Sequence, residues 1–220
     1  MPAIFGEKPP FISVLYGRKN SGKSVLIRYV CYEYRNDFSY IVVISASNDA
    51  NGYYSEFLPS AFIHTSYDPT LIESIIEKQI ELQKTKKSQM LLILDDILGC
   101  EGLGNMGTSQ SRPELMKIFT MNRHMGISLI VSTQGVKQIP RVLRNNACFS
   151  CIFRSMNQAI NDLYEEYSHL PKKEFYEFVQ KYTNNHHILI FNSRETDNTR
   201  TYACFKVPEP FLHKKFKLVY

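Results

Sequence analysis

The first residues in the chain with clear chemical capacity form a glycine-rich segment, residues 17–24, with the sequence GRKNSGKS. Gly17 and Gly22 can take backbone angles that a Cβ would resist, so successive backbone N–H groups can converge on phosphate at a helix N-terminus. Lys23 supplies a mobile cation for the β- and γ-phosphates, and Ser24 supplies a hydroxyl that can ligate Mg²⁺. We therefore expect a nucleoside triphosphate and Mg²⁺ to bind here. The expected binding residues are Gly17, Arg18, Lys19, Asn20, Ser21, Gly22, Lys23 and Ser24.

The surroundings of this segment are those that a phosphate loop requires. Residues 11–16 (FISVLY) form a short apolar run typical of a buried strand, and residues 25–34 have the apolar content of a packed helix. An accidental glycine turn is the alternative interpretation. The succession of strand, glycine loop and helix favours a phosphate loop.

A pair of acidic residues follows another apolar run. Residues 90–94 (MLLIL) are typical of a strand that is covered on both faces, and they end in Asp95 and Asp96. Ligands of parallel sheets lie beyond the carboxyl ends of the strands. We expect Asp95 to hold Mg²⁺ through its water shell and Asp96 to act as general base on the attacking water. Many such ATPases carry the longer Glu at the second position, so Glu101 is the next acidic side chain to consider.

A third apolar, β-branched run, residues 127–132, ends at Thr133 and Gln134. This order places an uncharged amide beside the same crevice. An amide can donate to phosphate and accept from water at once, so Gln134 is a candidate sensor of the γ-phosphate.

The rest of the chain alternates strands and helices. Residues 40–45 and 61–64 predict two strands between the phosphate loop and Asp95, and Asp68–Pro69 opens a helix. We therefore predict an α/β fold, a RecA-like P-loop NTPase with a mostly parallel central sheet flanked by helices. The later predictions are a helix capping box at residues 111–114, a strand within 147–153, helices at 157–167 and 172–182, and a terminal hairpin of 187–192 and 199–206.

Length and composition favour one core. The chain has 220 residues and a hydrophobic content of 44%, which suffices for a substantial interior. We expect an ATPase core at residues 1–155, with the C-terminal helices and β-hairpin of residues 156–220 packed on the same domain. No apolar run reaches a membrane span of about 18 residues, and no signal peptide is evident, so we expect a soluble intracellular protein. The His186–His187 pair lacks further ligands nearby, and we expect no metal there.

Four segments resemble a known family: GRKNSGKS, LLILDD, NRHMGISLIVSTQ and IPRVLRNNACFSCIF. They are similar to the double-stranded-DNA packaging ATPases of poxviruses, other large eukaryotic DNA viruses and virophages, within the FtsK–HerA superfamily. The resemblance implies a homo-oligomeric ring, a pentamer or hexamer, that uses ATP to move double-stranded DNA into a preformed capsid. It also implies capsid vertex or portal proteins as partners, and a location in the host-cell cytoplasm at the site of virus assembly or with the virion.

A ring motor takes a cation from the neighbouring subunit. Arg123, Gly126, Ile127 and Gln134 resemble the arginine, the sensor strand and the glutamine of the superfamily, so Arg123 is a candidate trans-acting catalytic residue. Arg144 matches a basic position in a later segment of the family and is the second candidate. The sequence leaves the choice open.

The sequence indicates contacts to DNA less clearly than it indicates the nucleotide site. The net charge of +5 favours a polyanion only mildly, and without a base-reading motif we expect contacts to DNA phosphates. The candidate element is the glycine-rich segment 99–111, for which a plain surface loop is the alternative.

Two other function classes stay open. A nucleoside or nucleotide kinase would need arginines in a closing lid, and an assembly adaptor would bind nucleotide without turnover.

Overall fold

The computed structural model describes residues 5–46, 52–97, 112–168, 170–195 and 201–220. The candidate DNA-contacting segment 99–111 lies outside these residues, as does Glu101. No helix in the described ranges is long and apolar enough to cross a membrane.

Eight strands form one sheet. They are β1 (Ile12–Tyr16), β2 (Tyr40–Ser45), β3 (Ile63–His64), β4 (Met90–Asp95), β5 (Ile127–Thr133), β6 (Phe149–Ile152), β7 (Ile188–Asn192) and β8 (Tyr202–Phe205). Their order is β3–β2–β4–β5–β1–β6–β7–β8. The pairs from β3 to β6 are parallel, and β7 and β8 add an antiparallel hairpin at one edge. The predicted α/β fold with a mostly parallel sheet is confirmed, as is the terminal hairpin.

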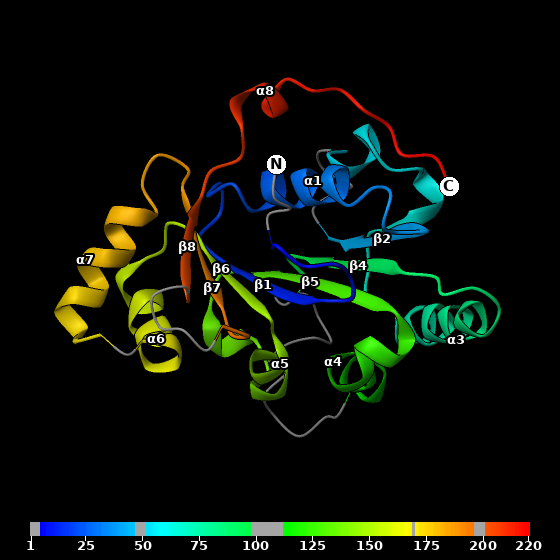
Figure 1. Cartoon of the computed structure of the whole chain (residues 1–220), viewed down its shortest axis with the longest axis horizontal. Coiled ribbons are helices and arrows are strands. Elements are labelled where there is room, and N and C mark those ends of the chain that lie inside the picture. The colour runs from blue at the N-terminus through cyan, green and yellow to red at the C-terminus, as the bar shows by residue number, and fades with distance from the viewer. Residues whose placement is uncertain (1–4, 47–51, 98–111, 169, 196–200) are drawn as a thin grey trace.

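Helices cover both faces of this sheet (Figure 1). The helices are α1 (Lys23–Glu33), α3 (Pro69–Thr85), α4 (Pro113–Met125), α5 (Arg141–Asn146), α6 (Asn157–Tyr167), α7 (Lys172–Tyr182) and α8 (Glu209–Leu212). One hydrophobic core lies between the sheet and the helices α3 to α7. A second core lies between the opposite face and α1, α8 and the C-terminal tail.

The central strands contribute to both cores at once. In β4, Leu92 and Leu94 belong to one core, whereas Leu91 and Ile93 belong to the other. Successive side chains of a strand point to opposite faces, so a strand covered on both sides reads as a continuous apolar run. This is why MLLIL could be recognised as a central strand.

The start of α4 corrects one prediction. The predicted capping box at residues 111–114 is wrong, because α4 begins at Pro113 with Arg112 in the N-cap position and no side chain caps it. Pro113 has no N–H to satisfy at the first helical position. The Glu114 carboxylate is buried and accepts a hydrogen bond from the Tyr67 hydroxyl instead.

The C-terminal tail packs over α1 against the segment that joins β2 to β3. The backbone N–H of Leu218 donates to the carbonyl of Phe57 at 2.9 Å. The guanidinium of Arg28 lies 5.5 Å from the ring centres of both Phe57 and Phe216. These contacts attach the β2–β3 segment, which carries Tyr54, to α1 and to the tail.

Candidate active site

The phosphate loop joins β1 to α1, and its two glycines are needed for different reasons. A Cβ added at Gly17 would lie 2.6 Å from Cβ of Phe153, so only glycine fits this close approach. Gly22 has a φ of 101°, a left-handed conformation that side chains disfavour, and it is the N-cap residue of α1. The N–H of Gly17 donates to the carbonyl of Thr133 at 3.1 Å, so the loop begins beside the carboxyl end of β5.

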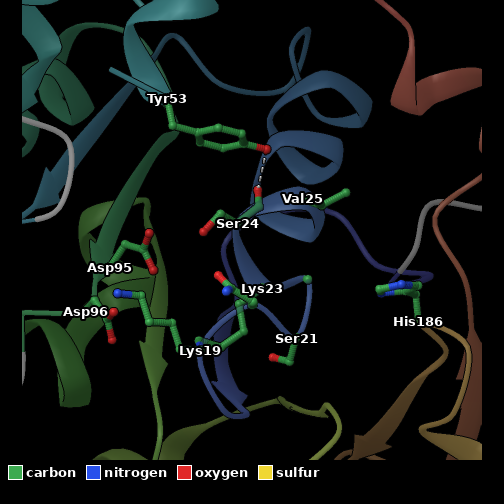
Figure 2. Close-up of a pocket in the computed structure, with 11 residues that line it drawn as sticks. Lys19, Ser21, Lys23, Ser24, Val25, Tyr53, Asp95, Asp96 and His186 are labelled. Carbon is green, nitrogen blue, oxygen red and sulfur yellow. Dashed lines mark hydrogen bonds between the residues drawn. The ribbon is translucent and has the colours of Figure 1, made fainter. Parts of the chain in front are cut away.

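A pocket of about 460 Å³ lies beyond the carboxyl ends of the parallel strands, between this loop and the end of β4. Figure 2 shows Lys19 and Ser24 of the loop pointing across it toward the acidic pair. The predicted site residues that line the pocket are Lys19, Asn20, Ser21, Gly22, Lys23, Ser24, Asp95 and Asp96. Three further residues line it that the sequence did not assign to this site, namely Val25, Tyr53 and His186.

The ammonium group of Lys23 is held by the loop itself. Its Nζ donates to the carbonyls of Gly17 at 2.7 Å and Arg18 at 3.1 Å. Burial lowers the pKa of Lys23, and the nearby carboxylates of Asp96 and Asp95 oppose that shift. The cation thus has two neutral backbone acceptors, which an anionic phosphate can replace with stronger, charge-assisted hydrogen bonds.

The carboxylate of Asp95 is held from both sides. Oδ2 accepts from the Tyr54 hydroxyl at 2.6 Å, and Oδ1 accepts from the Ser132 hydroxyl. Burial raises the pKa of Tyr54 well above its usual value, and the neighbouring Asp95 adds to the shift. The phenol therefore stays protonated and donates to Asp95. An ionised carboxylate has about four lone-pair sites, so each oxygen of Asp95 can still accept from a metal-bound water.

Oxygen ligands at this site fit a Mg²⁺ ion. Asp95 and the Ser24 hydroxyl face the same pocket (Figure 2), and Mg²⁺ prefers hard oxygen ligands while keeping several of its waters. Within the described ranges, no group of three or more His, Cys, Asp or Glu side chains could form an all-protein metal site.

Asp96 occupies an unusual backbone conformation. Its φ is 57°, in the left-handed region that costs free energy for a residue with a Cβ. The chain turns there at the end of β4, and the exposed Asp96 lines the pocket together with the buried Asp95. A carboxylate at this position is accessible to a water molecule.

The remaining predicted residues lie outside the pocket. Gln134 is exposed and follows Thr133, whose carbonyl holds the first residue of the phosphate loop. Arg123 lies in the last turn of α4, before the amino end of β5. The seven residues of β5 separate it from the phosphate-loop edge of the sheet by roughly 20 Å. Arg123 is exposed, and this distance keeps it from the phosphates of its own subunit.

Arg144 is engaged within its own chain. It lies on α5, its side chain is 15% exposed, and it forms an ion pair with Glu166 at 3.0 Å. Its guanidinium also donates to the carbonyl of Ile139 at 2.6 Å. These contacts fasten α5 to α6, and they occupy the group that a trans-acting arginine would present to a neighbour.

Several residues of the site escaped sequence reasoning. Tyr54 begins a short 3-10 helix (Tyr54–Glu56) between β2 and β3, and Tyr53 is its N-cap residue. The Tyr53 hydroxyl donates to the carbonyl of Ser24 at 3.2 Å. Ser132 pairs with Asp95 in the register of β4 and β5, so the strand order would have revealed it. His186 lies in the turn before β7 with a φ of 61°, and no sequence signal linked it to the loop.

The fold and the site together define a P-loop nucleoside triphosphatase, with the phosphate loop after β1 and the acidic pair at the carboxyl end of β4, two strands away in the sheet. The chain belongs to the family of the poxvirus A32 protein, whose family model matches residues 7–215. The predicted resemblance to the packaging ATPases of poxviruses and large DNA viruses is thereby confirmed.

Relatives in large DNA viruses support this assignment. Uncharacterized protein 075L of Invertebrate iridescent virus 6 is 28% identical over 204 residues, which cover 89% of this chain and 77% of the relative. Uncharacterized protein 015R of Frog virus 3 is 28% identical over 191 residues, and the match covers 84% of this chain but only 58% of that relative.

A solved structure shares the fold. The genome packaging NTPase B204 from Sulfolobus turreted icosahedral virus 2, in complex with ATP-gammaS, aligns with a TM-score of 0.66 and 24% sequence identity. The alignment covers 91% of this chain and 98% of B204. At this identity the likeness establishes the fold.

Proposed function

We propose that this chain is a Mg²⁺-dependent ATPase that drives the packaging of double-stranded DNA into a preformed viral capsid. The observation that carries the proposal is the pocket that Lys23 and Ser24 line together with Asp95 and Asp96, in a member of the poxvirus A32 protein family. The likeness of the fold to a genome packaging NTPase supports the same conclusion.

Each side chain of the pocket has a role in this chemistry. Lys23 exchanges its backbone acceptors for the β- and γ-phosphates, and Ser24 and Asp95 hold Mg²⁺, which neutralises the charge that develops on the phosphates. Tyr54 and Ser132 fix the orientation of Asp95. Asp96 accepts a proton from the attacking water.

Gln134 completes this arrangement at the carboxyl end of β5. Its amide orients the attacking water and reports the loss of the γ-phosphate, because an amide donates and accepts at once. Gln134 is bonded to Thr133, which holds the start of the phosphate loop. A shift of the amide would therefore be transmitted to the loop and to β5.

Hydrolysis occurs at the interfaces of a homo-oligomeric ring, a pentamer or hexamer, with Arg123 acting on the neighbouring subunit. Two observations support this role. None of the described residues that line the pocket is an arginine, although a guanidinium suits the charge of the transition state. Arg123 is exposed at the far end of β5, whereas Arg144 is occupied by Glu166.

The ring holds DNA through its phosphates and acts with capsid vertex or portal proteins. The net charge of +5 fits a polyanionic partner, and translocation requires contacts that do not depend on base sequence. The relatives are proteins of large DNA viruses, and packaging places the protein in the host-cell cytoplasm at the site of virus assembly or with the virion.

The test is the release of phosphate from ATP by the purified chain, with and without double-stranded DNA. We expect turnover that depends on Mg²⁺ and rises when DNA is added, and no turnover by Lys23→Ala. A parallel assay for phosphate transfer to nucleosides separates hydrolysis from the kinase alternative. Tight ATP binding without turnover, under conditions where the ring assembles, would favour the adaptor alternative and refute the proposal.

A further inference from the structure

The segment that follows α8, residues 213–220, carries three lysines on an exposed surface. The side chains of Lys214, Lys215 and Lys217 are exposed, and residues 210–220 contain no Asp or Glu. Among the residues that the structure describes, no side-chain carboxylate forms an ion pair with any of the three. In Figure 1 this segment runs from α8 across the outer side of α1 toward the segment between β2 and β3.

Alternating burial turns two of these lysines outward together. Phe216 and Leu218 pack into the core that covers α1, whereas Lys215 and Lys217 are exposed. This alternation is that of an extended chain, in which side chains two positions apart lie on one side, separated by roughly 7 Å. Phosphates on one strand of DNA follow each other at about 3.4 Å along the axis. Each of the two lysines can therefore meet a different phosphate.

Cations at the start of the segment and at the end of α1 extend this surface. The Lys214 ammonium lies 4.3 Å from the centre of the Tyr32 ring, and the Arg35 guanidinium lies 4.2 Å from the same centre. The electron-rich face of the ring attracts both cations and orients them. Arg28 donates to the carbonyl of Lys214 at 2.9 Å, so the backbone of the segment is held in place.

Neighbouring carboxylates do not cancel this positive charge. Glu56 pairs with Arg28 at 3.3 Å. Glu33 on α1 and Asp37 in the turn after it are the remaining acidic residues close to Tyr32 in the sequence. Four cations without an ion pair in the described part of the chain therefore stand against these two carboxylates, namely Arg35, Lys214, Lys215 and Lys217.

We propose that these four cations, which we call the α1–tail surface, bind the phosphates of double-stranded DNA. The inference rests on the proposed function, because a packaging ATPase must hold DNA without regard to its sequence. Three of the four are lysines, and an ammonium group is a point charge without acceptors, so it responds to phosphate charge and not to base identity. The even spacing of the exposed lysines favours a regular polyanion over an acidic protein segment.

The α1–tail surface is joined to the nucleotide site by two structural connections. The first is α1 itself, which begins at Lys23 of the phosphate loop. The second is the hydrogen bond from the N–H of Leu218 to the carbonyl of Phe57 at 2.9 Å. Phe57 follows the short helix that begins at Tyr54, whose hydroxyl donates to Asp95. DNA bound at this surface would therefore act on both the phosphate loop and the support of Asp95.

The test is the binding of fluorescently labelled double-stranded DNA to the full chain over a range of salt concentrations, together with ATPase rates. The double variant Lys215→Gln/Lys217→Gln removes two charges and leaves Phe216 and Leu218 in place. Two lost phosphate contacts should reduce the slope of log K against log salt concentration by about 2, and weaken binding at least about tenfold near physiological salt. The ATPase rate without DNA should equal that of wild type, and its stimulation by DNA should be reduced.

Two further variants separate a local contact from other effects. Lys86→Gln/Lys87→Gln makes the same charge change at two exposed lysines after α3, which packs on the opposite face of the sheet. It should bind DNA with the wild-type salt slope; a loss equal to that of the first double variant would trace binding to net charge and overturn the inference. Lys215→Arg/Lys217→Arg keeps both charges and should keep DNA binding, and its failure to do so would exclude a phosphate contact.

The remaining outcomes distinguish this inference from the proposed function. If wild type binds no DNA under conditions where the ring assembles, the packaging proposal fails, and this inference fails with it. If wild type binds DNA and Lys215→Gln/Lys217→Gln keeps the wild-type affinity, salt slope and stimulation, the inference alone is overturned. Unchanged DNA binding with a lost affinity for polyglutamate would assign the α1–tail surface to an acidic protein and would overturn the inference as well.

Discussion

Replacing Tyr54 by Phe removes one hydrogen-bond donor from Asp95 and keeps the aromatic ring. Tyr54 is 1% exposed, and its ring packs against Tyr53 and Phe57. Its hydroxyl donates to Asp95 Oδ2 at 2.6 Å. Because burial and Asp95 both raise the pKa of Tyr54, the hydroxyl stays protonated throughout the neutral pH range. The substitution therefore tests the hydrogen bond from Tyr54 to Asp95 at any pH near neutrality.

The size of the effect follows from the kind of bond. A hydrogen bond to a charged group contributes about 1.5–3 kcal/mol, which corresponds to a factor of roughly 10 to 100. In the variant, the Ser132 hydroxyl still donates to Oδ1 of Asp95. The carboxylate of Asp95 therefore stays in the site, but its orientation is less firmly fixed. We expect kcat/KM for ATP hydrolysis to fall by about that factor, and half-saturation by Mg²⁺ to shift to higher concentration. ATP binding without Mg²⁺ should be unchanged.

The assay is a Mg²⁺ titration of ATPase rate at fixed ATP, paired with ATP binding in the presence of a chelator. Tyr40→Phe is the matched control, since the Tyr40 hydroxyl donates to Gln79 Oε1 at 2.9 Å, away from the pocket. Its Mg²⁺ dependence should equal that of wild type. A folded Tyr54→Phe protein with wild-type kcat/KM and wild-type Mg²⁺ dependence would refute the role of Tyr54, and would place the metal elsewhere. Equal loss of metal-free binding would show that the whole pocket had been disturbed.

Three further outcomes are expected. Lys23→Ala should weaken ATP binding and abolish turnover. Asp96→Asn should still bind Mg²⁺-ATP but hydrolyse it at least about a hundredfold more slowly, and full activity of this variant would exclude Asp96 as the base. Binding to double-stranded DNA, measured by fluorescence anisotropy, should be independent of sequence and should weaken steeply with salt, and a flat salt dependence would contradict phosphate contacts. Mixing Arg123→Ala with Lys23→Ala should partly restore ATPase activity, because some interfaces of a mixed ring pair an intact loop with an intact arginine; demonstrably mixed rings without recovery would remove Arg123 from the role.

The elements that carry the phosphate loop and the acidic pair could be predicted because each one is locally encoded. Residues 90–94 read as a continuous apolar run, and residues 11–16 as an apolar run interrupted only by Ser13, because their strands are covered by a hydrophobic core on each face. Gly17 and Gly22 stood out because the loop requires glycine at both positions. The helices α6 and α7 have the bounds that the sequence predicted.

The supporting residues could not be predicted, because they depend on long-range arrangement. Tyr54 lies in a 3-10 helix of three residues, which is too short for a hydrophobic periodicity, and its contact to Asp95 spans 41 residues. Ser132 is one of several small polar residues in strands, and only the pairing of β4 with β5 assigns it to Asp95. The helices α5 and α8, of six and four residues, are too short for a periodic signal.

The segment that carries Tyr54 should open at a lower temperature than the rest of the site. The segment that carries Tyr54 ends in β3, an edge strand of two residues. It is attached to the rest of the protein by the hydrogen bond between Leu218 and Phe57 and by the stacking of Arg28 on Phe57 and Phe216. Short edge elements open at lower free energy than central strands. On heating, ATP hydrolysis should therefore disappear several degrees before far-ultraviolet circular dichroism records the loss of the sheet. Coincident transitions would show that the segment unfolds only together with the whole. If hydrolysis is lost first, this attachment sets the working temperature range of the enzyme, and the sheet sets its melting temperature.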